Sequence, residues 1–225
     1  NPAGVRDDIN YSLKRTPGRR RVTFVGDSFT AGHGVNRVGD RFVNLLRQRH
    51  PEWEVHCLAE LGMDTADEIR FLGDCTAKGY ELEDVVLVYC LNDVADLVSE
   101  WTVTRERIFS VRDDPGWLKD SSYFINLLYY RIRAMRNPEL RNYFQFVRET
   151  AHGPVWEKQQ ARLREFKQLV ESRGGRLRVV TFPFLHRLGA EYEFQAVHDS
   201  LNAFWQREAV PHLDLLEVYR GYSTG

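Results

Sequence analysis

A serine follows directly after a short apolar stretch near the amino terminus. Residues 22–25 predict a buried strand, and Gly26-Asp27-Ser28 comes immediately after it. The carboxyl end of the first strand of an α/β sheet is a place where such sheets build their sites. A helix that begins nearby would direct its backbone N–H groups and the positive end of its dipole at the serine. This geometry predicts that Ser28 is an acyl-transfer nucleophile whose product is a tetrahedral oxyanion.

The residues around Ser28 exclude three other motifs. Thr30 stands where the Gly-x-Ser-x-Gly elbow of α/β-hydrolases has its last glycine. Gly32-His33-Gly34 lacks the third glycine of a dinucleotide-binding fingerprint. The sequence also has no Gly-x-x-x-x-Gly-Lys phosphate loop at this place. Ser28 therefore does not belong to any of these three motifs.

The pattern of apolar residues predicts five strands that alternate with helices. Strands are expected over residues 22–25, 53–58, 85–90, 177–182 and 213–216. Helices are expected over residues 38–46, from Asp64 or Thr65 to Leu72, and over residues 155–171 and 194–205. The β-α-β-α-β order of the first half predicts a parallel sheet with right-handed crossovers.

Residues 92–153 interrupt this alternation. The segment is too long for a plain crossover, and it contains a helical pattern within residues 124–135 and a shorter one around 144–147. We expect a helical insertion after the third strand, within one domain of residues 1–225 that begins with an irregular lead-in over residues 1–20. The insertion is expected either to cover the site and shape substrate choice or to pack on one face of the sheet. The sequence favours neither.

Composition and charge narrow the function classes. Hydrophobic residues make up 43% of the chain, enough for a folded core, and the net charge of -1 gives no field that favours nucleic acid. The arginine cluster at residues 19–21 is predicted to be a solvated connector. No apolar run is long enough to span a membrane, and no secretory signal opens the sequence. An exported and a cytoplasmic location both stay open, as does the oligomeric state.

Cysteine usage points away from metal and disulfide chemistry. The chain has three cysteines, Cys57, Cys75 and Cys90, and no pair has metal-ligand spacing. Cys57 and Cys90 fall in or beside predicted buried strands, where cysteine acts as a small hydrophobic residue. No zinc site or disulfide framework is expected, and the proposed chemistry requires no metal or organic cofactor.

The sequence resembles the SGNH (GDSL-like) hydrolases in three blocks. The first block is residues 26–32, the second contains Gly62 within residues 61–65, and the third is residues 91–94. The blocks occur in the family's order, each after a predicted strand, and the resemblance spans most of the chain outside residues 92–153. It implies a flavodoxin-like, three-layer α/β/α sandwich around a parallel five-stranded sheet. It also implies esterase or acyl-hydrolase activity on a small-molecule or glycan ester.

The resemblance assigns an oxyanion hole to three groups. These are the Ser28 N–H, the Gly62 N–H and the side-chain amide of Asn92. The chemistry agrees, because glycine lets a substrate approach its N–H closely and asparagine offers a neutral donor. Asn92-Asp93 alone would predict a helix N-cap. With Gly-Asp-Ser upstream the oxyanion role is favoured, while Asp27 is expected to brace the turn and Asp93 to anchor the Asn92 loop.

The sequence departs from the family at two places. Cys90 stands where the third block usually opens with glycine, which is a mild change. The family supplies its histidine in an Asp-x-x-His motif after the last strand, and no such motif occurs in this sequence. We expect His33 and His186 to be solvent-facing or substrate-lining residues rather than the catalytic base. We expect the Asp/His segment to lie past Gly225.

Three functions follow from these residues. The favoured one is an ester hydrolase that forms an acyl-enzyme on Ser28 and acts on an O-acyl carbohydrate or a small lipid ester. The second is a non-catalytic protein that uses the same fold to bind a glycan or a protein, which the missing base supports. The third is an O-acyltransferase that uses the same site and delivers the acyl group to a sugar hydroxyl.

Overall fold

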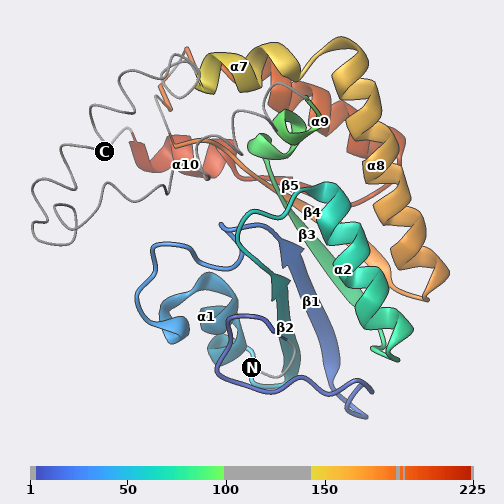
Figure 1. The fold of residues 1–225 in the computed structure, drawn as a ribbon. Coiled ribbons are helices and arrows are strands. Elements are labelled where there is room, and N and C mark those ends of the chain that lie inside the picture. Colours follow the sequence, from blue (N-terminus) through green and yellow to red (C-terminus); the bar gives the residue numbers. More distant parts are fainter. Residues whose placement is uncertain (1–3, 99–142, 186–187, 190, 224–225) are drawn as a thin grey trace, which may run out of the picture. The chain divides into compact units, whose positions relative to one another are not determined.

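The computed structural model describes residues 4–98, 143–185, 188–189 and 191–223 (Figure 1). The chain divides into two compact units. One comprises residues 1–93 and 159–225, and the other comprises residues 94–158. Every residue predicted to act as nucleophile or oxyanion donor belongs to the first unit, which is therefore described in most detail.

A parallel sheet of five strands forms the centre of the first unit, in the order β2-β1-β3-β4-β5. The strands are β1 (Arg20–Gly26), β2 (Trp53–Ala59), β3 (Asp84–Cys90), β4 (Arg176–Phe182) and β5 (His212–Asp214). The predicted fold class is confirmed, because the number of strands, their direction and their flanking helices all agree. The first four strands extend at most two residues beyond their predicted bounds, in keeping with apolar runs that are buried on both faces.

Helices cover both faces of the sheet (Figure 1). They are α1 (Phe42–Arg49), α2 (Thr65–Ala77), α8 (Gly153–Ser172), α9 (Gln195–Arg207) and α10 (Leu216–Ser223), with 3₁₀ turns η1 (Val38–Asp40) and η2 (Leu91–Leu97). On one face Phe24 of β1 meets Phe42 of α1. On the other face Tyr89 of β3 accepts a hydrogen bond from Gln159 of α8. The α1 helix therefore lies on the opposite face from α8, as right-handed crossovers require.

Two predicted elements end differently from expectation. The strand predicted over residues 213–216 stops at Asp214, and Leu216 begins α10, which the sequence pattern did not indicate. Asp214 explains the change, because its carboxylate accepts a hydrogen bond from the Leu216 N–H and so caps the new helix. The short helix predicted near residues 144–147 is present as α7 (Tyr143–Thr150). The helix predicted within residues 124–135 lies outside the described residues. No described helix has the length and hydropathy needed to cross a membrane.

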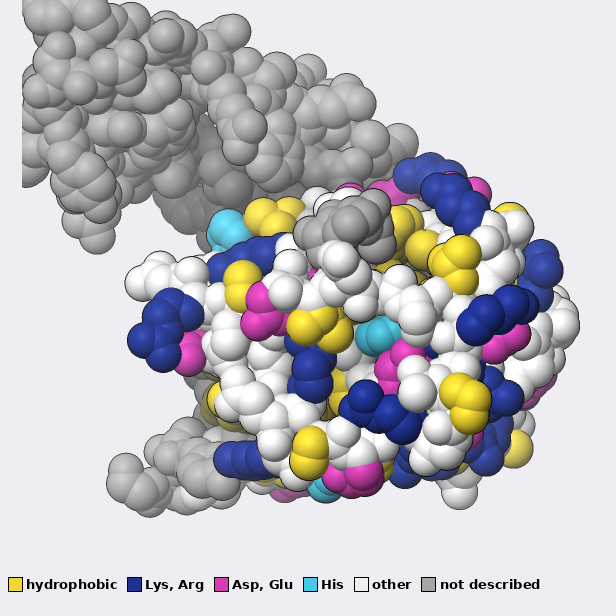
Figure 2. All heavy atoms as spheres, turned by 90° about the horizontal axis from the view of Figure 1, so that it is seen from below, with side chains coloured by type: hydrophobic (Ala, Val, Ile, Leu, Met, Phe, Trp, Pro, Cys, Tyr) yellow, Lys and Arg dark blue, Asp and Glu magenta, His cyan; other side chains and the backbone are white. Residues whose placement is uncertain are grey.

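The arginine cluster at residues 19–21 is not a solvated connector, because β1 already begins at Arg20 and Arg21 is fully buried. Arg21 and Glu54 are register partners on β1 and β2, and they form a two-point ion pair at 2.8 and 3.0 Å. Acidic and basic side chains are also interspersed on the face seen from the end at which the strands begin (Figure 2).

Arg21 also holds the lead-in segment against the sheet. Its guanidinium donates to the carbonyl oxygens of Ser12, Leu13 and Glu81 at 2.9–3.0 Å. Burial alone would raise the pKa of Glu54, but hydrogen bonds from Arg21 and Ser12 outweigh it and lower the pKa to about 2. The pair is therefore charged at neutral pH and fully hydrogen-bonded.

Replacing Arg21 with methionine should destabilise the protein by about 3–5 kcal/mol, because Glu54 would be left charged and unpaired in the interior. Chemical denaturation followed by circular dichroism measures this loss. The double variant Arg21→Met/Glu54→Leu should recover part of it, since no buried charge remains. Arg37→Met is the control, because its side chain is 82% exposed in its ion pair with Asp40 and should cost under about 1 kcal/mol. Equal losses in the two single variants would contradict the account.

Candidate active site

The turn after β1 explains the glycine of Gly-Asp-Ser. A Cβ atom on Gly26 would lie 2.2 Å from Thr30 Oγ1 and 2.9 Å from the Val88 carbonyl oxygen, so a larger residue does not fit. The chain then turns tightly, and the His33 N–H donates to the Ser28 carbonyl at 2.8 Å. The helix expected near Ser28 does not begin there, since α1 starts only at Phe42. Positive φ at Gly32, +70°, keeps the segment in turns.

Asp27 connects the loop after β1 to the loop after β3. Its Oδ1 accepts the Phe29 N–H at 2.9 Å, and its Oδ2 accepts the Asn92 Nδ2–H at 3.3 Å. Burial raises the pKa of Asp27, while these two hydrogen bonds oppose the rise. A carboxylate only accepts, so it holds Asn92 with the amide nitrogen turned toward it. Asn92 Nδ2 has a second hydrogen, and no described residue accepts it.

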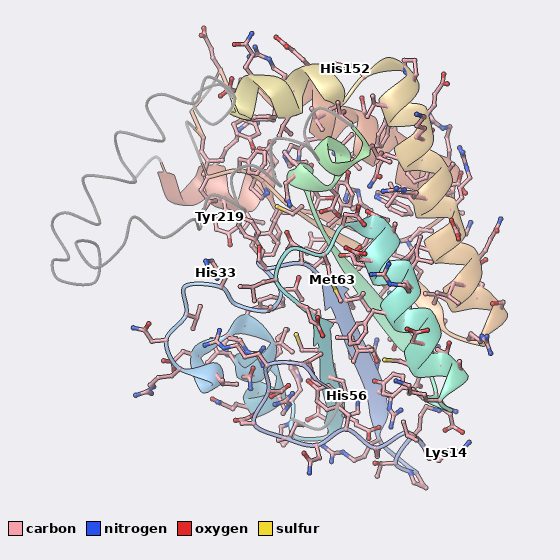
Figure 3. The ribbon with its side chains drawn as sticks, in the orientation of Figure 1. Lys14, His33, His56, Met63, His152 and Tyr219 are labelled. Atoms are coloured by element: carbon pink, nitrogen blue, oxygen red, sulfur yellow. The ribbon has the colours of Figure 1, made fainter. Side chains whose placement is uncertain are left out.

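Ser28 lies between the two other predicted segments. Because β1 is flanked by β2 and β3, the loops that carry Gly62 and Asn92 follow its two neighbouring strands at the same edge. Figure 3 labels His33 and Met63, which lie at the end where β1 and β2 finish. Ser28 is half-buried, and its hydroxyl forms no hydrogen bond within the described residues. Its oxygen is therefore not committed to another group among the described residues.

Gly62 has a backbone conformation that favours glycine. Its φ is +80°, in the left-handed region, and a Cβ atom there would meet no heavy atom within 4 Å. The residue is exposed. These features are compatible with the predicted close approach of a substrate, which itself stays a prediction.

Asp93 is buried and bonded to the start of α2. Its Oδ2 accepts the Thr65 hydroxyl at 3.2 Å, and Gln159 of α8 donates to the same threonine oxygen at 2.8 Å. The Asp64 side chain caps α2 by accepting the Asp67 N–H at 2.9 Å. The loop after β3 is thus tied to two helices, which gives a structural basis for the anchoring role predicted for Asp93.

Glu68 is a buried acid behind this loop that the sequence did not single out. It lies in the first turn of α2, fully buried, and neither carboxyl oxygen has a hydrogen-bond partner within the described residues. Burial raises the pKa of Glu68 well above its usual range, and the carboxylates of Asp27, Asp64 and Asp67 raise it further. The helix dipole favours ionisation at this place, but desolvation dominates. Glu68 therefore keeps its proton to a higher pH than an exposed glutamate.

Glu68 should make the folded state less stable as pH rises. Its folded pKa exceeds its unfolded value of about 4.3, so the free energy of unfolding falls as pH rises from that value through the folded pKa. Glu68→Gln places a neutral side chain of the same shape as the protonated acid, and it should remove this loss of stability at higher pH. The variant should have the same Tm as the parent protein near pH 4. Near pH 8 its Tm should be higher, by about 2–4 °C for each kcal/mol of unfolding free energy that is recovered.

Calorimetry across this pH range measures the difference. Asp27 has a raised pKa as well, so part of the same pH dependence should persist in the Glu68 variant. Glu165→Gln, at an exposed position of α8, is the matched control and should leave the profile unchanged. Parallel curves for the parent and the Glu68 variant would show that the pKa of Glu68 is the same in the folded and unfolded states, which would contradict the account.

No described histidine side chain forms a hydrogen bond with the Ser28 hydroxyl. His33 is exposed in the turn after Ser28, and His186 lies outside the described residues. The structure pairs buried His198 with Asp214, Nδ1 to Oδ1 at 2.8 Å, a contact that no sequence spacing indicates. Asp214 ends β5, which is three strand spacings from β1, or about 14 Å. Within the described residues, no group of three His, Cys, Asp or Glu side chains is placed to hold a metal ion.

Comparisons with known proteins give two solved structures that are similar over most of this chain. The crystal structure of TesA is 16% identical, with a TM-score of 0.48, and the match covers 86% of this chain and 77% of that chain. A mutant of the esterase AlinE4 is 14% identical, with a TM-score of 0.47, and the match covers 91% and 80%. No protein-family model and no curated protein matches the chain.

The strand order β2-β1-β3-β4-β5 with helices on both faces is the flavodoxin-like arrangement. The chain therefore has the fold that its resemblance to the SGNH hydrolases implies, with the segments of Ser28, Gly62 and Asn92 at one edge of its sheet.

Proposed function

We propose that the protein is a serine-dependent carboxylic ester hydrolase of the SGNH type, acting on an O-acyl carbohydrate or a small lipid ester. The observation that supports this most is the hydrogen bond from Asn92 Nδ2 to Asp27 Oδ2. It fixes the amide beside the Ser28 turn and leaves one N–H for a ligand. Ser28 itself is partly exposed, and no described residue forms a hydrogen bond with its hydroxyl.

In the proposed reaction Ser28 Oγ attacks the ester carbonyl carbon and loses its proton to a base. The oxyanion binds the N–H groups of Ser28 and Gly62 and the free N–H of Asn92. The alcohol leaves with a proton from the base, and an acyl-serine remains. Water then attacks the acyl carbon and gives a proton to the same base. The base passes this proton to Ser28 Oγ as the bond to the acyl carbon breaks, which releases the carboxylic acid and restores Ser28.

Turnover of esters by the complete encoded protein tests the proposal. Short p-nitrophenyl esters and O-acetylated sugars should release acid, and the release should depend on a base that titrates with pH. Transfer of the acyl group to an added sugar would instead support the transferase alternative. A folded complete protein that turns over none of these esters but binds a glycan would overturn the hydrolase and support the non-catalytic alternative.

A further inference from the structure

A second hollow lies beside α2, away from the three loops described above. Its volume is about 420 Å³, within the range of small-molecule pockets. It is lined by residues of the lead-in, β2, α2 and the segment before β3, namely Tyr11, Leu13, Leu58, Phe71, Asp74, Cys75, Lys78 and Tyr80. None of these residues belongs to the segments of Ser28, Gly62 or Asn92.

The walls of this pocket present aromatic rings rather than hydroxyl groups. The Tyr80 hydroxyl is engaged with Thr23 Oγ1 at 2.9 Å and His56 Nδ1 at 2.7 Å. The Tyr11 hydroxyl bonds Asp7 and the backbone of Cys57. A ligand in the pocket would therefore meet ring faces and aliphatic side chains, and these favour a flat apolar molecule.

Polar recognition falls to two exposed side chains on α2 and just after it. Asp74 and Lys78 are four residues apart, and neither side chain forms an ion pair or a hydrogen bond with any described residue. Asp74 only accepts hydrogen bonds and Lys78 only donates them. A hydroxyl group suits both, because it can donate to Asp74 and accept from Lys78. A carboxylate would be attracted by Lys78 but repelled by Asp74, and an amine would be attracted by Asp74 but repelled by Lys78, so neither charge is favoured by both side chains.

We propose that this pocket binds a small neutral aromatic alcohol of the phenol type, with its ring among Tyr11, Phe71 and Tyr80 and its hydroxyl between Asp74 and Lys78. The proposal is independent of the ester hydrolase proposed above. It needs no residue of that site, so either can fail without the other.

Cys75 provides a built-in reporter for the test. It lines the pocket and is partly exposed, whereas Cys57 and Cys90 are buried. Burial raises the pKa of the Cys75 thiol, so labelling with a disulfide reagent is best followed at about pH 8.5. Phenol should slow the labelling of Cys75 by about tenfold at ten times its dissociation constant. Cys75→Ser should abolish the fast labelling and so confirm which thiol reports.

The ligand class is tested with matched probes and surface variants. Three probes should protect Cys75 at least about tenfold more weakly than phenol. Cyclohexanol lacks the aromatic ring, and benzoate and benzylamine carry a charge. Asp74→Asn/Lys78→Met should weaken phenol protection about tenfold when the protection is expressed relative to the variant's own labelling rate without ligand, because both charges also act on the Cys75 thiol. Absence of protection by phenol would overturn the pocket as its site. Equal protection by all four probes, or full protection in the double variant, would overturn the recognition by Asp74 and Lys78.

Discussion

Replacing Ser28 with alanine should lower kcat/KM for p-nitrophenyl acetate in the complete protein by at least about 10³-fold. The reason is that alanine has no oxygen to form the acyl-enzyme, so only slow attack by water within the oxyanion hole would remain. Folding should be unaffected, because the Ser28 hydroxyl forms no hydrogen bond within the described residues. Steady-state kinetics gives the first quantity and thermal unfolding the second.

Ser172→Ala is the matched control for this experiment. Ser172 ends α8, and its hydroxyl donates only to the Leu169 carbonyl at 2.9 Å. This change should leave kcat/KM within about twofold of the parent protein. A Ser28 variant that kept a tenth or more of the parent activity would mean that another residue carries the acyl group.

Replacing Asn92 with alanine should lower kcat by about 10²–10³-fold with little change in KM. The amide is asked to bind charge that develops only in the transition state, so its loss should raise the barrier without weakening substrate binding. Asn92→Asp should be at least as damaging, because it removes the donor and places a second acid against Asp27 Oδ2. Kinetics of both variants on one ester separates kcat from KM.

Asn36→Ala is the control for the asparagine series. Asn36 is exposed in the loop that precedes α1, and its side chain takes no part in the site. It should leave both kinetic constants unchanged. If Asn92→Ala raised KM alone, Asn92 would be a ground-state binding residue and the oxyanion assignment would be wrong.

The sequence predicts the scaffold well because the signals for it are local. The run of apolar residues at 85–90 can only be a buried strand, and β3 is buried along its whole length. The order of strands and helices then places the loops of Ser28 and Asn92 at one edge. The hydrogen bond between Asn92 and Asp27 could not be predicted from the sequence, because the two residues are 65 positions apart and their rotamers depend on packing.

Two of the features that the sequence did not indicate are pairings of charged side chains that lie far apart in the chain. Arg21 looked solvated because its neighbours are arginines, yet its partner Glu54 lies across the sheet, 33 positions later. His198 and Asp214 meet because α9 packs on β5, and no fixed spacing encodes that contact. Such pairings become visible only when the register of the strands is known.

Covalent labelling of the complete protein with a fluorophosphonate tests the central claim most directly. The probe phosphonylates an activated serine oxygen, and digestion followed by mass spectrometry locates the adduct. The account predicts a single adduct on Ser28, which Ser28→Ala removes and Ser172→Ala retains. An adduct on a different residue, or none on a folded protein that hydrolyses esters, would contradict the assignment of Ser28 as the nucleophile.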